Sequence, residues 1–218
     1  MNPSHHPNEA WLLDYALGNI APAFEAVLRA HIGICSSCQD SVRLAERLGG
    51  DMLAALDAGP ASHLDAKTIC ATYEQDCESG ESFSRAPAQP VSDSVESLVS
   101  TYLDSALEAM PWRRIGRDLR LCRLESKADA NMWMLRGRPG AVLPLHTHQG
   151  DELTLVLKGA YFCGSQIYRA GDIEDADESV EHRPVITRDS ECICLAVTTG
   201  QLRFKEWLPR LAQPIIGI

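Results

Sequence analysis

The sequence predicts a multi-domain α + β protein, in which a small N-terminal helical bundle precedes a β-sandwich or barrel. Residues 8–57 place apolar side chains at helical spacing. From residue 112 onward, short runs rich in Leu, Val and Ile alternate with Gly, Pro and Asp, which is typical of many short strands. Residues 79–94 have the Ser-, Pro- and Gly-rich composition of a linker. We therefore expect domains over 1–78 and 95–218, joined by 79–94.

Four helices are expected in the first domain. Asn8 can cap the first helix and Gly18 can end it. Three further helices and a short amphipathic helix after the linker are expected over 21–32, 36–48, 62–77 and 95–110. Gly49 and Gly50 weaken the third helix, although the apolar pattern can extend it to Leu56.

The second domain is expected to consist of strands, because its apolar runs are short and are bounded by turn residues. The runs cover 119–124, 132–135, 153–157, 160–168, 185–187 and 192–198.

Composition and charge exclude several function classes. The 218 residues are 45% apolar and 23% charged, as in an ordinary folded protein, and lack an apolar run of about 20 residues, so we expect no transmembrane helix. A net charge of −10 argues against direct binding to nucleic acid. Residues 1–78 carry four Lys and Arg against eleven Asp and Glu, which favours a basic protein partner, although a merely solvated acidic surface is the alternative. No signal peptide is evident, so a cytoplasmic location is expected.

A first candidate metal site is formed by His31, Cys35 and Cys38, spaced at i, i+4 and i+7. One continuous helix would place them on one stripe, and a break near Gly33 would place the two Cys in a turn and the next helix. Two thiolates and an imidazole suit Zn²⁺, which requires a fourth ligand. His5 and His6 both precede the first helix, and spacing cannot separate them, although we favour His6. The alternative is that the Cys are small core residues.

A second candidate site lies in the strand-rich half. His146 and His148 can point to the same face of a strand, Glu152 follows in the next turn or strand, and His182 is the remaining histidine of this half. Three imidazoles and a carboxylate suit Fe, Mn, Ni, Cu or Zn. The alternative is a set of solvated loop histidines.

The residues from Gly140 to Gly159 resemble the first cupin motif throughout its spacing. Gly171, followed by His182, resembles the second motif, from which Asp177, Ser179 and Ile186 depart. The resemblance implies a cupin, that is, a double-stranded β-helix or jelly-roll barrel, whose metal ligands carry over onto His146, His148, Glu152 and His182.

His6 together with His31-x₃-Cys35-x₂-Cys38 resembles the zinc-binding anti-σ signature, and its combination with a cupin resembles the ChrR family of anti-σ factors. The resemblance implies zinc ligation by these four residues. It also implies that the helical domain inhibits a group IV (extracytoplasmic-function, ECF) σ factor, and that the cupin mediates release by singlet oxygen and related oxidants. Neither direct nucleic-acid binding nor membrane attachment is expected, and homo-oligomerisation of the free chain stays open.

Two other functions compete with this one. The first is a metal-dependent cupin enzyme, such as a dioxygenase or isomerase, with an accessory zinc domain, for which Glu174, Asp175 and Asp177 could supply an acid–base pair. The second is a sensor that binds a small ligand without turnover. Cys192 and Cys194 alternate on one expected strand, where packing in the barrel wall is favoured over a redox role.

Overall fold

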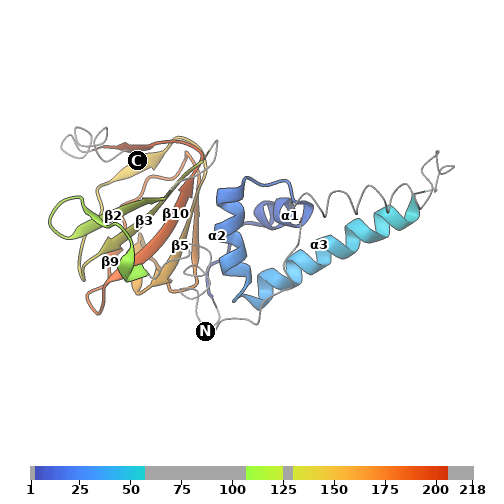
Figure 1. Ribbon diagram of the computed structural model, residues 1–218, viewed down its shortest axis with the longest axis horizontal. Coiled ribbons are helices and arrows are strands. Elements are labelled where there is room, and N and C mark those ends of the chain that lie inside the picture. The colour runs from blue at the N-terminus through green and yellow to red at the C-terminus, as the bar shows by residue number, and fades with distance from the viewer. Residues whose placement is uncertain (1–2, 57–106, 125–129, 206–218) are drawn as a thin grey trace, which may run out of the picture. The chain divides into compact units, whose positions relative to one another are not determined.

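The structure is a computed structural model that describes residues 3–56, 107–124 and 130–205. Three helices, α1 (Glu9–Leu17), α2 (Pro22–Ile32) and α3 (Ser36–Ala55), precede a strand-rich part, which confirms the predicted fold class (Figure 1). The expected helix over 62–77 lies outside the described residues, as does most of that over 95–110, where only a short 3₁₀ turn, η1 (Leu107–Ala109), is described. In the described parts of the chain, no helix combines the length and apolarity needed to cross a membrane.

The predicted signals set the ends of α1. The Asn8 side chain accepts hydrogen bonds from the backbone N–H groups of Ala10 and Trp11, and Gly18 ends the helix with φ of 68°. Gly49 and Gly50 do not interrupt α3, which runs through both to Ala55, so the longer of the two expected extents is the one found.

The chain divides into two compact units, the first formed by residues 1–46 with 92–218 and the second by residues 47–91. The described portion of the second unit contains the last turns of α3, where Leu48, Met52 and Leu53 are exposed. The domain boundaries expected from the sequence, 1–78, 79–94 and 95–218, stay a prediction.

Three antiparallel sheets build the strand-rich part. A six-stranded sheet has the order β1 (Arg113–Arg114), β2 (Leu119–Leu124), β3 (Asn131–Gly137), β10 (Cys192–Thr198), β5 (Glu152–Lys158), β8 (Ile173–Ala176). The other two sheets have the orders β11 (Leu202–Phe204), β4 (His146–His148) and β7 (Gln166–Arg169), β6 (Ala160–Cys163), β9 (Val185–Ile186).

The single strand expected over 160–168 is instead a hairpin. Its turn includes Gly164, whose φ of 57° a residue with a side chain rarely adopts, and β6 and β7 pair antiparallel on either side of it. The short strands β1, β8 and β11 fall outside the expected runs, because two to four residues are too few for a period of two to stand out.

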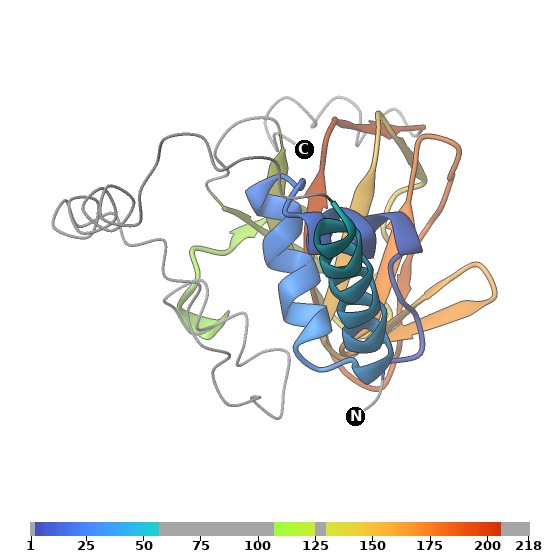
Figure 2. The ribbon, with the colours of Figure 1, turned by 90° about the vertical axis from the view of Figure 1, so that its right-hand side faces the viewer.

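Both faces of the six-stranded sheet are covered. On the outer face, Leu153 and Leu155 share a core with Val27 and Leu28 of α2, which contacts β5 and β10. Figure 2 looks onto this side, with α1 and α2 in front of the strands. On the inner face, Trp133 and its neighbours pack toward β11 and line the barrel. Burial on both faces explains why every residue of β10 is buried.

Candidate metal centres

The first candidate metal-binding group lies at the junction of α2 and α3. Helix α2 ends at Ile32 and α3 begins at Ser36. His31, Cys35 and Cys38 therefore lie around a break between two helices, and not on one continuous helix. His31 is in the last turn of α2, Cys35 directly precedes α3, and Cys38 is in its first turn. All three side chains are buried, with exposed fractions of 0–2%.

His6 completes this group. Its Nδ1 lies 3.3 Å from Cys35 Sγ and 3.5 Å from Cys38 Sγ, while His31 Nε2 lies 3.3 Å from Cys38 Sγ. The four ligand atoms all lie within 4.8 Å of one another. Zn–S bonds of about 2.3 Å and Zn–N bonds of about 2.0 Å in a tetrahedron separate ligand atoms by about 3.5 Å. The group therefore has the dimensions to hold one such ion.

His5 points elsewhere. Its Nδ1 lies 3.2 Å from Asp172 Oδ2, and its ring packs against Tyr168 with centroids 4.3 Å apart. The structure thus brings His6, and not its neighbour, to the two thiols.

The imidazole of His31 is held in one orientation by the β7–β8 turn. Its Nδ1 lies 2.7 Å from the Gly171 carbonyl oxygen, which can only accept, so Nδ1 carries the proton and Nε2 presents a lone pair to Cys38. Burial lowers the pKa of His31 to about 4, so the ring is neutral at pH 7. Gly171 permits this approach because its φ is 94° and a Cβ there would lie 2.8 Å from the Ile34 side chain.

The segment before His6 is anchored by Asp172, a residue that the sequence did not single out as a site. Its carboxylate accepts hydrogen bonds from the backbone N–H groups of Ser4 (2.6 Å), His5 (3.1 Å) and Arg169 (2.8 Å). Burial would raise the pKa of Asp172, but these hydrogen bonds outweigh it and lower the pKa. The carboxylate is therefore ionised at neutral pH and fixes the backbone that carries His6.

When no metal is bound, the thiol of Cys38 is hard to ionise. Burial, followed by the neighbouring Cys35, raises the pKa of Cys38 to about 12. A metal ion that binds here must displace its proton, since the thiolate is the ligand.

The second group lies inside the barrel. His146 and His148 share one face of β4, Glu152 begins β5, and His182 comes from the loop before β9. Paired backbone hydrogen bonds of 3.1 Å between His146 and His182 fix the two segments side by side. The four side chains are 4–6% exposed, and their ligand atoms lie within 4.8 Å of one another.

Lone pairs converge in this second group. His146 Nδ1 donates to the Pro144 carbonyl (2.8 Å) and His182 Nδ1 donates to Glu174 (2.8 Å), which leaves both Nε2 atoms unprotonated in the neutral rings. These two Nε2 atoms lie 2.9 Å apart, close enough to share a proton or to coordinate one metal ion together. His148 Nδ1 and Glu152 Oε2 are buried without a hydrogen-bond partner and lie 3.4 Å apart. The donor set thus fits a divalent metal ion.

The pKa values of His146 and His182 are shifted in opposite directions. Burial lowers the pKa of His146 to about 4, with the nearby His182 adding to the effect. For His182, burial also lowers the pKa, but the hydrogen bond and charge of Glu174 outweigh burial and raise it.

Strand β8 presents its two acids on opposite faces. Glu174 accepts from His182 and from the Tyr161 hydroxyl inside the barrel. The next residue, Asp175, accepts from the backbone and side chain of Asn8 (3.0 and 2.8 Å) and from the Trp11 indole, next to α1. The acids suggested as an acid–base pair therefore do not converge.

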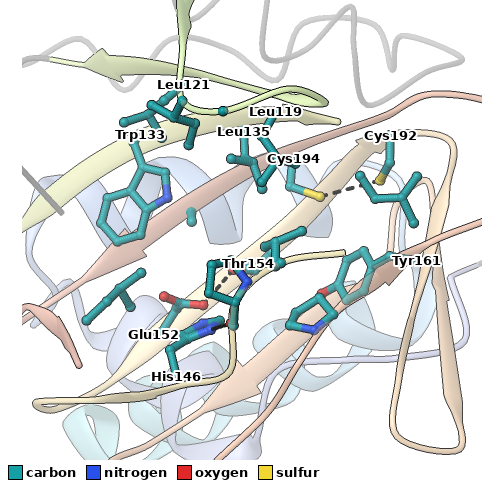
Figure 3. Close-up of a pocket in the computed structure, with 18 of the residues that line it drawn as sticks. Leu119, Leu121, Trp133, Leu135, His146, Glu152, Thr154, Tyr161, Cys192 and Cys194 are labelled. Carbon is teal, nitrogen blue, oxygen red and sulfur yellow. Dashed lines mark hydrogen bonds between the residues drawn. The ribbon is translucent and has the colours of Figure 1, made fainter. Parts of the chain in front are cut away.

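The remaining residues singled out in the sequence lie in different surroundings. Asp177 is exposed and pairs with Ser179. Cys192 and Cys194 lie 3.6 Å apart in the barrel wall (Figure 3).

Comparisons with known proteins agree with this architecture. Residues 104–203 match the model of the ChrR Cupin-like domain family. The chain is 33% identical to the anti-sigma-E factor ChrR of Cereibacter sphaeroides, over the full length of both. It also resembles the crystal structure of Rhodobacter sphaeroides SigE in complex with the anti-sigma ChrR, with a TM-score of 0.72 and 32% identity over 91% of this chain and 99% of that one.

Proposed function

The chain belongs to the ChrR family of anti-sigma factors, and we propose that it binds and inhibits a group IV (ECF) σ factor and releases it under oxidative stress, such as exposure to singlet oxygen. One observation carries the proposal, namely 33% identity that extends over the whole of this chain and the whole of a protein named as an anti-sigma factor. A σ factor acts on RNA polymerase, so we also propose that the chain acts in the cytoplasm.

The proposed cofactor of the first group is Zn²⁺, held by His6, His31, Cys35 and Cys38. Two thiolates and two imidazoles in a closed, largely buried set are what structural zinc sites use. The four ligands come from the N-terminal segment, the end of α2 and the start of α3, so one ion would tie three segments together. The free energy of such binding adds directly to the folding free energy of the segments that the ion ties together. We infer that it holds the helices in the arrangement that the σ factor recognises.

We propose that the barrel group holds a second divalent metal ion, with His146, His148, Glu152 and His182 as its ligands. These ligand types suit Zn, Mn, Fe or Ni. A bound metal would supply a redox-active or Lewis-acidic centre for signal perception. The Pro144 carbonyl and the Glu174 carboxylate fix the rings of His146 and His182, so that both Nε2 atoms point toward the place the metal would occupy.

A metal-dependent enzyme is the second candidate function. It is less well supported, because the relative that matches over both full lengths is named as a regulator. In addition, Glu174 and Asp175 are each committed to structural hydrogen bonds on opposite faces of β8.

Co-expression tests the proposal. The full chain is expressed with an affinity-tagged ECF σ factor from the same genome, and the complex is purified and added to core RNA polymerase. We expect stoichiometric capture and loss of σ-dependent transcription. Failure of the metal-loaded chain to bind any ECF σ factor of that genome would contradict it.

A further inference from the structure

A cavity of about 770 Å³ lies inside the barrel, far larger than a metal ion requires. His146 and Glu152 lie at one end of it, and the inner face of the six-stranded sheet forms one wall (Figure 3). His182, which is grouped with these two residues, also lines the cavity. Cavities of about 300–1,000 Å³ that combine apolar walls with a few polar groups are typical of small-molecule sites.

The wall is apolar because side chains along each strand point alternately toward the cavity and away from it, and those that face it are mostly apolar. Residues of β2 and β3 that face the cavity are Leu119, Leu121, Trp133 and Leu135, and β11 contributes Phe204 from the other side. In contrast, Arg120 and Cys122 of β2 point away from it and are not among the lining residues. Such a wall favours a ligand with an extended apolar body.

Cationic side chains line the same cavity at the edge of the sheet. Arg113 of β1 and Arg123 of β2 are exposed at this edge, and Arg113 pairs with the cavity-facing Leu121. Arg114 pairs instead with Arg120, on the face turned away from the cavity.

No ion pair among the described residues involves Arg113 or Arg123. The acids that line the cavity, Glu152 and Glu174, lie with the metal-binding group. The arginine end is therefore complementary to an anionic head group.

The pairing of the strands gives the length of the site. Arg123, Trp133, Ala196 and Thr154 occupy one row across β2, β3, β10 and β5. Three steps between strands at about 4.8 Å each give about 14 Å from the arginine to the strand that carries Glu152. An extended alkyl chain advances about 1.3 Å per C–C bond of 1.5 Å, so this row matches about ten to twelve carbons.

We propose that the barrel binds a medium-chain carboxylic acid, of the fatty-acid class, as a non-covalent ligand. The carboxylate pairs with Arg123 of β2 and Arg113 of β1, and the alkyl chain lies against Leu121, Trp133 and Leu135 toward the candidate metal group. This site goes beyond inhibition of a σ factor and does not depend on it.

Titration calorimetry with sodium decanoate, added to the purified full chain, tests the proposal. Saturable binding of one decanoate per chain is expected. Decyltrimethylammonium, which has the same alkyl length and the opposite head-group charge, should bind at least about tenfold more weakly. Absence of saturable decanoate binding, or equal binding of the two amphiphiles, would overturn the proposal.

Two charge reversals on β2 provide a matched pair. Arg123→Glu, which faces the cavity, should weaken decanoate binding by about tenfold or more. Arg120→Glu, on the same strand but facing away, should leave it within about twofold, and circular dichroism should show both variants folded. Equal loss in both variants would contradict the assigned site. Capture of the σ factor by both variants is measured in parallel, so failure of the ligand site is distinguishable from failure of the proposed function.

Discussion

Single residues outside the metal-binding groups determine how their ligands are presented. The spacing of His31, Cys35 and Cys38 could be read from the sequence because the three lie within eight positions. Their supports could not be predicted, since Asp172 binds the N-terminal segment and the Gly171 carbonyl binds His31 across 140 or more residues. A local pattern carries no information on such contacts, and the choice between His5 and His6 depended on them.

Asp172→Asn is predicted to loosen the N-terminal segment. An amide cannot replace an ionised carboxylate that accepts from Ser4, His5 and Arg169, so we expect a loss of about 1–3 kcal/mol in unfolding free energy. Zinc affinity, measured by competition with a chromophoric chelator, should fall as well. Glu191→Gln is the control, because it removes a carboxylate paired with Arg136 and leaves zinc affinity unchanged. Equal zinc affinity in the parent and Asp172→Asn would contradict the positioning role.

Zinc affinity at the first group is predicted to rise with pH. The Cys38 thiol, whose pKa is raised to about 12, is protonated at neutral pH in the metal-free chain, so zinc must displace that proton. His31, with a pKa lowered to about 4, is already neutral and adds nothing above about pH 6. Chelator competition at about pH 6.5 and about pH 8 should therefore show tighter binding at the higher pH. An affinity that is flat or falls over this range would speak against thiolate ligation.

Among the elements, β8 is a strand that the sequence did not reveal. It supports the barrel group through Glu174 and bonds to the start of α1 through Asp175. Its four residues, Ile173–Ala176, are too few to show an alternation, although Gly171 before it was recognised as part of a motif. The long helices and the buried β5 and β10 could be predicted, because capping residues and apolar runs are local signals.

Glu174→Gln is predicted to weaken metal binding in the barrel. Its carboxylate fixes the His182 ring, and loss of such a support typically costs about 10–100-fold in metal affinity. Asp175→Asn, on the opposite face of the same strand, provides the matched control and should leave the barrel affinity unchanged. Metal content after dialysis against graded chelator is the measurement. If both variants lose metal equally, the effect belongs to the strand and not to the ring orientation.

In the whole molecule, residues from the helical N-terminal segment and from the strand-rich segment share one hydrophobic core, although their amino-acid compositions suggested separate domains. Leu28 of α2 is fully buried together with Leu153 and Leu155 of the six-stranded sheet. Apolar spacing marks each residue as buried but does not say against which element it packs, so the sharing could not be predicted.

Leu28→Ala is predicted to lower the unfolding free energy by about 2–5 kcal/mol, because it leaves a cavity in this shared core. Leu44→Ala, at a half-exposed position of α3, should change it by less than about 0.5 kcal/mol. Urea unfolding is followed by circular dichroism and by tryptophan fluorescence. We expect one transition that shifts in both signals, and a shift in the helix signal alone would contradict a common core.

We propose that one zinc ion, held by His6, His31, Cys35 and Cys38, maintains the surface that captures a σ factor. Zinc content and σ capture are measured together in the full chain and in Cys38→Ser, with Cys122→Ser, a buried thiol in neither candidate metal group, as the control. We expect Cys38→Ser to lose one zinc per chain and σ capture with it, while Cys122→Ser keeps both. Tight σ capture by a Cys38→Ser chain that lacks this zinc would contradict it.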